Sequence, residues 1–198
     1  MNWLAHTFLS TSHIEFQLGN LLADVVRGDA RLAMTAEFQR GAACHKEIDA
    51  FTDSHPIVRR SRMRVPDTYR RFSGVLLDVF YDYLLAQHWS RFAQVPLAQF
   101  TSDFYVAAGA ASLRLPGDAQ LMLERIIRHD SLTSYRTSAG VERALHRISA
   151  YLASRWRKPF ALEASVPHLM AAEAELTDDF LEFFPALEAH VQGWIAGH

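Results

Sequence analysis

The sequence predicts an all-α fold, a single-domain bundle of about seven or eight helices that spans residues 1–198. Apolar side chains recur at spacings of three and four residues along most of the chain, which is the period of a helix with one buried face. No stretch alternates apolar and polar residues with period two over a useful length, so we expect no sheet. The chain is 49% hydrophobic and 21% charged, a composition that supports a full hydrophobic core.

Glycine and proline residues set the predicted ends of the helices. Gly28 is expected to end the first helix, and Pro56 follows the end of the second, because the residue before a proline disfavours the helical conformation. Residues 115–118 form a loop, and Pro185 marks a kink or break in the helical C-terminal stretch. Residues 1–13 form a short helix or an extended lead-in. Helices are predicted over residues 14–28, 35–52, 67–92, 97–111, 118–130 and 139–155, with further helix between 160 and 198.

The overall composition excludes several classes of function. A formal net charge of -2 argues against general nucleic-acid binding. The single cysteine, Cys44, allows no internal disulfide, fits a reducing compartment and is expected to be buried and structural. Residues 1–6 lack the features of a signal peptide, and Asp24, Asp78 and Asp82 interrupt the longest apolar runs, so no segment is expected to span a membrane. We therefore expect a cytoplasmic protein that binds neither nucleic acid nor membrane.

Two carboxylates lie in an otherwise apolar segment, residues 75–85. Asp78 and Asp82 are four residues apart, so in a helix they lie on the same face. A helix that is apolar nearly all round is buried, and a buried carboxylate without a partner costs several kcal/mol or takes up a proton. The pair therefore needs a cation, either a metal ion or arginines such as Arg70 and Arg71.

A second polar pair precedes the first. His45 and Asp49 are also four residues apart, and a His/Asp pair followed by a buried Asp/Asp pair favours a hydrolytic metal site. Asn20, Asp24 and Arg27 form one polar stripe on the helix before them, which on its pattern alone fits an ordinary solvated face equally well.

Arginines are concentrated between residues 59 and 71. This segment has six arginines and one acid, Asp67, a local charge of about +5 in a chain of nearly zero net charge. Arginine suits both phosphate groups and acidic protein surfaces, so the segment predicts an acidic partner or a phosphate-bearing substrate. The alternative is a solvated loop and helix start. The arginines are Arg59, Arg60, Arg62, Arg64, Arg70 and Arg71.

Several motifs resemble the bacterial acyl carrier protein phosphodiesterases in order and spacing over the first ninety residues. The C-terminal half resembles that family only in its helical character and in a Phe-Phe-Pro sequence near its end. Lys46 and Tyr83 depart from the family, which often has Arg and His there. The motifs are Met1-Asn2-Trp3-Leu4-Ala5-His6, Gly19-Asn20-Leu21-Leu22-Ala23-Asp24 with Arg27-Gly28, His45 with Ile48-Asp49 and Thr52-Asp53, Arg70-Arg71, Asp78-Val79 with Asp82, and His88-Trp89.

The family is similar in chemistry and helical fold to the HD-type metal-dependent phosphohydrolases. The resemblance implies hydrolysis of the phosphodiester that joins 4′-phosphopantetheine to a serine of holo acyl carrier protein, giving the apo carrier protein and 4′-phosphopantetheine. It implies Mn²⁺ as the preferred metal, with Mg²⁺ possible. Carboxylates with one or two histidines suit these metals better than zinc, which favours thiolates.

Residue roles follow from the resemblance together with this chemistry. We expect Asp24, His45 and Asp78 to be metal ligands. His6, Asp49 and Asp82 are expected to be further ligands, orienting groups or proton-transfer groups. Asn20 and Arg27 are assigned to substrate binding, with Arg27 at the phosphate. The residues assigned to the acidic face of the carrier protein are Arg59, Arg60, Arg62, Arg70 and Arg71.

Two alternatives remain open from the sequence. One is another HD-like phosphohydrolase that acts on a nucleotide or a small phosphoester. The other is a non-catalytic helical binding protein in which arginines neutralise the aspartates. The oligomeric state and the number of metal ions are not determined by the sequence.

Overall fold

The computed structural model describes all 198 residues and contains helices and turns but no strands, so the all-α prediction is confirmed. Four short 3₁₀ helices are Asp67–Phe72, Trp89–Arg91, Ser112–Arg114 and Leu162–Ser165. The α-helices are α1 (Trp3–Phe8), α2 (Ile14–Leu21), α3 (Gly28–Leu32), α4 (Ala36–Ser54), α5 (Pro56–Arg64), α6 (Ser73–Gln87), α7 (Leu97–Ala111), α8 (Gly117–Arg128), α9 (Ser131–Ser134), α10 (Ser138–Trp156), α11 (Val166–Ala171) and α12 (Glu173–Gly197).

The predicted count of seven or eight helices is wrong, because the chain forms twelve α-helices. The missed helices are mostly one or two turns long, too short for a period of 3.6 residues to show in the sequence. Gly28 begins α3 with a positive φ of 55° instead of ending a helix. α12 continues through Pro185, so the chain does not break there. The apolar face around that proline, including Phe183 and Phe184, is fully buried and holds the helix in place.

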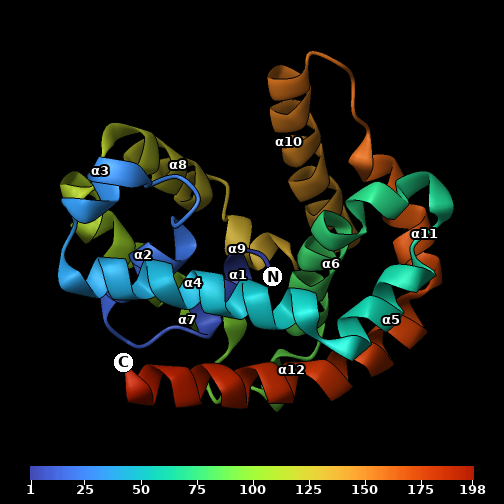
Figure 1. Cartoon of the computed structure of the whole chain (residues 1–198), viewed down its shortest axis with the longest axis horizontal. Coiled ribbons are helices and arrows are strands. Elements are labelled where there is room, and N and C mark those ends of the chain that lie inside the picture. The colour runs from blue at the N-terminus through green and yellow to red at the C-terminus, as the bar shows by residue number, and fades with distance from the viewer.

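A single cluster of 45 buried residues forms the core. α6 runs through its middle, and Leu76, Val79, Phe80 and Leu84 of this helix are fully buried. α4 and α12 run side by side along one flank of the molecule (Figure 1). No helix combines the length and the apolar character that crossing a lipid bilayer requires.

The contact between α2 and α4 is the most extensive helix contact in the molecule and depends on two glycines. A Cβ atom on Gly19 would lie 2.0 Å from the carbonyl oxygen of Phe38, and one on Gly41 would lie 2.0 Å from that of Phe16. Only glycine permits such an approach of two backbones. The approach brings Asn20 of α2 within hydrogen-bond distance of the His45 side chain on α4.

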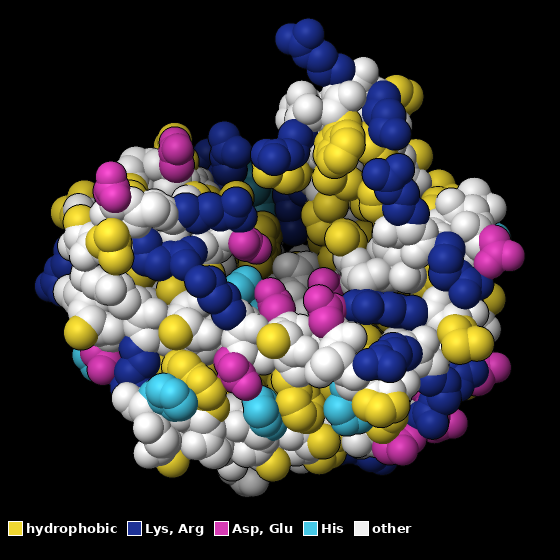
Figure 2. Space-filling view, in the orientation of Figure 1, with side chains coloured by type: hydrophobic (Ala, Val, Ile, Leu, Met, Phe, Trp, Pro, Cys, Tyr) yellow, Lys and Arg dark blue, Asp and Glu magenta, His cyan; other side chains and the backbone are white.

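α8 and α10 stand on either side of a hollow above α1 and α4 (Figures 1 and 2). The first half of α10 is anchored in the core by Val141, Ala144 and Leu145. Its second half projects from the body of the protein, and Tyr151 and Trp156 are 61% and 55% exposed there. The hollow is therefore bounded on one side by a helix with a free end.

Candidate active site

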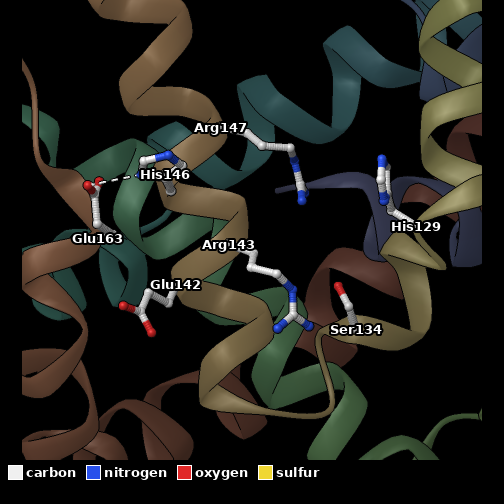
Figure 3. A pocket seen from close by; sticks show the side chains of 7 residues that line it. All are labelled: His129, Ser134, Glu142, Arg143, His146, Arg147 and Glu163. Atoms are coloured by element: carbon white, nitrogen blue, oxygen red, sulfur yellow. Dashed lines mark hydrogen bonds and ion pairs between the residues drawn. The ribbon is translucent and has the colours of Figure 1, made fainter.

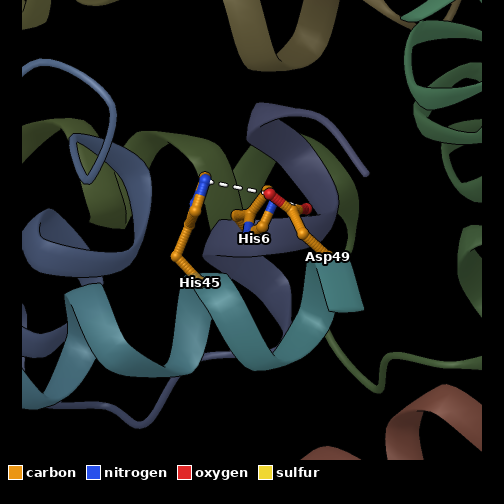
Figure 4. Close-up of side chains that lie close together, drawn as sticks. All are labelled: His6, His45 and Asp49. Carbon is orange, nitrogen blue, oxygen red and sulfur yellow. Dashed lines mark ion pairs between the residues drawn. The ribbon is translucent and has the colours of Figure 1, made fainter. Parts of the chain in front are cut away.

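Two helices bring three potential metal ligands together at the floor of the hollow (Figure 4). His6 comes from α1, and His45 and Asp49 come from successive turns of α4. The Nε2 atom of His6 lies 3.3 Å from Asp49 Oδ1, and the Nε2 atom of His45 lies 3.2 Å from Asp49 Oδ2. The two imidazole rings stack with their centroids 4.1 Å apart. Both Nε2 atoms and the carboxylate therefore converge on one point.

Asn20 orients both histidines. Its Nδ2 donates to the main-chain carbonyl of His6 at 3.0 Å and to Ser10 Oγ at 2.9 Å, so its Oδ1 must face the His6 ring and accept from Nδ1 at 2.8 Å. The main-chain carbonyl of the same residue accepts from Nδ1 of His45 at 2.8 Å. With both Nδ1 atoms acting as donors, Nε2 is the atom that each ring, when neutral, would offer to a metal ion.

The structure therefore corrects the role that the sequence suggested for Asn20. Its side chain is fully buried, so it does not face a bound substrate. It acts on the site by holding the rings of His6 and His45.

The charges of the cluster suit a cation. Burial and the positive charge of His45 lower the pKa of His6 to about 4. The Nε2 atom of His6 is buried and has no hydrogen-bond partner. Burial opposes the protonated form of His45, but Asp24 and Asp49 outweigh it and raise its pKa to about 9. Burial likewise opposes the charged form of Asp49, but the neighbouring His45, His6 and the α-amino group of Met1 hold its pKa well below the usual range.

Two more of the predicted ligands line the same cavity, which has a volume of about 260 Å³. Asp24 follows α2, and its Oδ2 lies 3.7 Å from His45 Nε2. Asp78, on α6, accepts a hydrogen bond of 2.9 Å from the α-amino group of Met1, which also lies 3.5 Å from Asp49 Oδ1. The tightest cluster is thus His6, His45 and Asp49, whereas the sequence placed Asp24, His45 and Asp78 first.

Asp82 has a different position from the other acids. It is fully buried, and its two oxygens accept from the main-chain N–H groups of Leu4 at 2.7 Å and Ala5 at 3.1 Å. Burial raises its pKa to about 7, although these N–H groups oppose the rise. Asp82 therefore caps the start of α1 and fixes the helix that carries His6, an orienting role rather than that of a ligand.

The donor atoms at the floor of the hollow fit a divalent cation. An unpartnered buried imidazole nitrogen, a second imidazole and up to three carboxylates surround one cavity, and no thiol faces it. Nitrogen and oxygen donors of this kind suit Mn²⁺ and related metals. The ammonium of Met1 between Asp49 and Asp78 shows that this corner of the cavity already accommodates positive charge.

Most of the arginines between residues 59 and 71 have acidic partners. Arg60 and Arg64 both bind Asp179 of α12, at 2.7 Å and 2.8 Å. Arg60 also pairs with Glu182, Arg62 pairs with Asp53, and Arg70 pairs with Asp67. Arg59 and Arg71 are the two without one. Since Asp179 and Glu182 are more than a hundred residues away in sequence, counting charges within the segment could not reveal this neutralisation.

A second cavity of about 710 Å³ adjoins the first, and sequence analysis did not anticipate it. Arg27, Arg125 and Arg147 line it together with apolar side chains of α8 and α10. A third cavity of about 480 Å³ continues from it through His129 and Arg147 (Figure 3). The only signal in the sequence was the pair Arg143 and Arg147, four residues apart, with Glu142 as the one acid beside them. Residues shared by the first two cavities are Asn2, Trp3, Asp24, Val25, Met122 and Ile148.

Comparison with known proteins decides the family. The family model described as acyl carrier protein phosphodiesterase matches residues 1–187. The chain belongs to this family. An acyl carrier protein phosphodiesterase of Yersinia pestis is 32% identical over 201 residues, covering 97% of this chain and 98% of the relative. Another, from Pectobacterium atrosepticum, is 30% identical over 188 residues, covering 94% and 95% of the two chains.

No solved structure matches the chain. The family membership therefore rests on the sequence comparisons, and the residues in the active-site cavity are consistent with it. The matched region, residues 1–187, includes every residue of the cluster as well as α8 and α10, which form the walls of the hollow.

Proposed function

We propose that this protein is a metal-dependent phosphodiesterase that hydrolyses the bond between 4′-phosphopantetheine and the serine of holo acyl carrier protein. The products are apo carrier protein and 4′-phosphopantetheine. The activity for which the family and its members are named supports this proposal. The structural observation that carries it is the convergence of His6, His45 and Asp49, with both rings held by Asn20 so that Nε2 faces the cavity.

The proposed metal is Mn²⁺, with Mg²⁺ as the alternative. His6, His45 and Asp49 would hold it, with Asp24 and Asp78 at the edge of the same cavity. A divalent cation in such a site lowers the pKa of a water molecule and offsets the negative charge of phosphoryl oxygens. His45 would hold the metal through Nε2 only as a neutral ring, so the proton that this ring carries beside Asp24 and Asp49 would leave when the site is filled.

The chain's own residues position the phosphodiester. Arg27 lines the adjoining cavity and is held by Asp24 at 2.9 Å, so its guanidinium is placed to bind a phosphoryl oxygen at the mouth of the site. Asp24 and Asp78 are the carboxylates at the edge of the cluster. In the proposed mechanism one of them accepts a proton from the attacking water and gives it to the serine oxygen as the bond between that oxygen and phosphorus breaks.

Two broader statements accompany this function. We place the fold with the HD-like phosphohydrolases, on the support of an all-helical scaffold with His and Asp ligands on adjacent helices. We place the activity in the cytoplasm and in fatty acid biosynthesis, on the support of the carrier-protein substrate and the reduced, buried Cys44.

The decisive experiment uses the purified protein with holo acyl carrier protein and Mn²⁺, followed by intact mass spectrometry. We expect conversion to the apo form, and no conversion when a chelator is present. A parallel panel of nucleotides and small phosphodiesters tests the other HD-like activity. Unchanged holo protein at saturating Mn²⁺, with turnover of a nucleotide, would replace the proposal with that alternative. No turnover of any substrate would favour the non-catalytic binding protein.

A further inference from the structure

The exposed side of α10 and the loop after it carry an unbalanced positive charge. Residues 138–162 contain five Arg or Lys side chains and one acid, Glu142. All five are exposed, and none lies within 4.0 Å of a carboxylate. In this they differ from the arginines between 59 and 71, most of which are paired with acids. The five are Arg143, Arg147, Arg155, Arg157 and Lys158.

Part of this charge forms a stripe that begins in the hollow. Arg143, Arg147, Tyr151 and Arg155 follow one another at intervals of four residues, so each lies beside the next in a row that winds slowly around α10. Arg147 and Tyr151 line the cavity of about 710 Å³ that adjoins the metal ligands. The stripe therefore runs from the cavity beside the cluster to the free end of the helix. Figure 2 shows several Lys and Arg side chains around hydrophobic ones on this projecting part.

We propose that this stripe of α10, together with Arg157 and Lys158 of the loop after it, is the docking surface for the carrier protein, through carboxylates on the carrier's surface. The inference rests on the proposed function for the identity of the partner. Charge complementarity supports it, because exposed cations without partners attract an acidic protein more strongly than arginines already neutralised by their own chain. Exposed Tyr151 and Trp156 add aromatic surface of the kind enriched at protein interfaces.

Continuity with the site supports the same conclusion. The phosphodiester to be cleaved is joined directly to the carrier protein, so a docked carrier must stand at the mouth of the hollow. α10 forms a wall of that hollow, and Arg147 and Tyr151 belong both to the charged stripe and to the cavity lining. Arg60 and Arg64, by contrast, are engaged with Asp179 of α12 and line none of the three cavities at the hollow.

The test compares charge reversal on the two surfaces. The double variant Arg143→Glu/Arg155→Glu changes two exposed residues that do not line the cavity of the cluster. At low salt we expect its KM for holo carrier protein to rise about tenfold or more with kcat little changed. The variant Arg59→Glu/Arg70→Glu carries the same change of charge on the segment 59–71 and should shift KM much less. The charge-conserving variant Arg143→Lys/Arg155→Lys should behave like the wild type.

A binding measurement without catalysis separates this inference from the proposed function. Binding of labelled apo carrier protein to the enzyme in chelator can be measured by fluorescence anisotropy. Affinity should be lowest for Arg143→Glu/Arg155→Glu, and higher for Arg59→Glu/Arg70→Glu and for the wild type. The difference between Arg143→Glu/Arg155→Glu and the wild type should shrink near 1 M salt, where the Debye length is about 3 Å. If no turnover occurs but this binding pattern holds, the docking surface stands and the proposed reaction fails.

Three outcomes would overturn the inference. One is wild-type binding and KM in Arg143→Glu/Arg155→Glu. Another is a larger loss in Arg59→Glu/Arg70→Glu, which would place the carrier on the arginines predicted from sequence. The third is binding of RNA or of anionic phospholipid vesicles that depends on Arg143 and Arg155 when carrier protein binding does not. If circular dichroism shows that the first variant does not fold, Arg155→Glu/Arg157→Glu at the free end of α10 replaces it with the same expected result.

Discussion

Asp49 and Asp179 are both carboxylates among charged groups, but their partners differ in kind. Asp179 is 1% exposed and accepts from Arg60, Arg64 and Ser61. Arginine does not lose its proton in proteins, so these partners are permanent. Asp49 faces a cavity, and its side-chain partners are His6 and His45, which release protons in the accessible pH range. Asp179 therefore has a complete, fixed environment, whereas Asp49 has one that a metal ion can enter.

The comparison also separates a stabilising ion pair from a candidate active site. The sequence allowed a protein in which arginines neutralise the aspartates. That arrangement exists here, but at Asp179 and not at the cluster. A carboxylate is a better candidate for metal binding when its neighbours are imidazoles with oriented rings than when they are guanidinium groups. Substitutions at the two kinds of carboxylate should therefore affect metal binding and stability differently.

The largest effect is expected from Asp49→Asn. The amide keeps the shape but removes the charge that both histidines face, so Mn²⁺ affinity and turnover should each fall by about a hundredfold or more. Isothermal titration with Mn²⁺ and the intact-mass assay measure the two losses. The thermal midpoint should stay close to the wild type. Normal Mn²⁺ affinity in a folded variant would remove Asp49 from the ligands.

Asp78→Asn tests which residues form the ligand set, because the sequence placed Asp78 among the first ligands and the structure places it at the edge of the cavity. If His6, His45 and Asp49 form the principal ligand set, this variant should lose less Mn²⁺ affinity than Asp49→Asn, when both are titrated under the same conditions. A greater loss in Asp78→Asn would restore the ligand set Asp24, His45 and Asp78.

Asp179→Asn should lower stability rather than metal affinity. It leaves Arg60 and Arg64 without their buried partner, and the two arginines are partly exposed and can rehydrate, so we expect a loss of about 2–3 kcal/mol in the free energy of unfolding. Urea denaturation measures it. Mn²⁺ affinity per folded molecule should not change. A variant that loses Mn²⁺ binding without losing stability would contradict the division between the two carboxylates.

Asp82→Asn should lower the free energy of unfolding by less, about 1–2 kcal/mol. The amide accepts a hydrogen bond through its oxygen only, so one N–H group at the start of α1 loses its acceptor. Since α1 carries His6, Mn²⁺ affinity should fall with stability. Urea denaturation with and without Mn²⁺ measures both. An unchanged unfolding free energy would show that the cap contributes nothing.

The pH dependence of stability gives the finest comparison. Burial opposes the charge on Asp179, but Arg64, Ser61 and Arg60 outweigh it and lower its pKa. A lowered pKa in the folded state means that the stability it provides is present above the unfolded value of about 3.9 and is lost as pH falls below it. The stability difference between the wild type and Asp179→Asn should therefore be constant above about pH 5 and narrow below 3.9. If the stability difference between the two proteins instead grew as the pH fell, the pKa of Asp179 would be raised in the folded protein rather than lowered.

Helical character was predictable from the sequence because the spacing of apolar side chains along a helix is a local property. The helix predicted over residues 97–111 has the same two ends as α7. The helix predicted over residues 35–52 differs from α4, residues 36–54, by only one or two residues at each end. His45 and Asp49 share a face because four residues make about one turn. The short helices could not be predicted, because one helical turn contains too few buried residues to show a period in the sequence.

The sequence by itself thus determined the helical class, the family motifs and the pair on α4. Only the tertiary structure decided which partners each side chain has. It brought His6 against His45, made Asn20 the residue that orients both rings, used Asp82 as a cap, and neutralised Arg60 and Arg64 with an acid on α12. The physical reason is that the period of a helix is written in neighbouring residues, whereas the partner of a charge depends on how distant helices pack, here on the backbone contact that Gly19 and Gly41 permit.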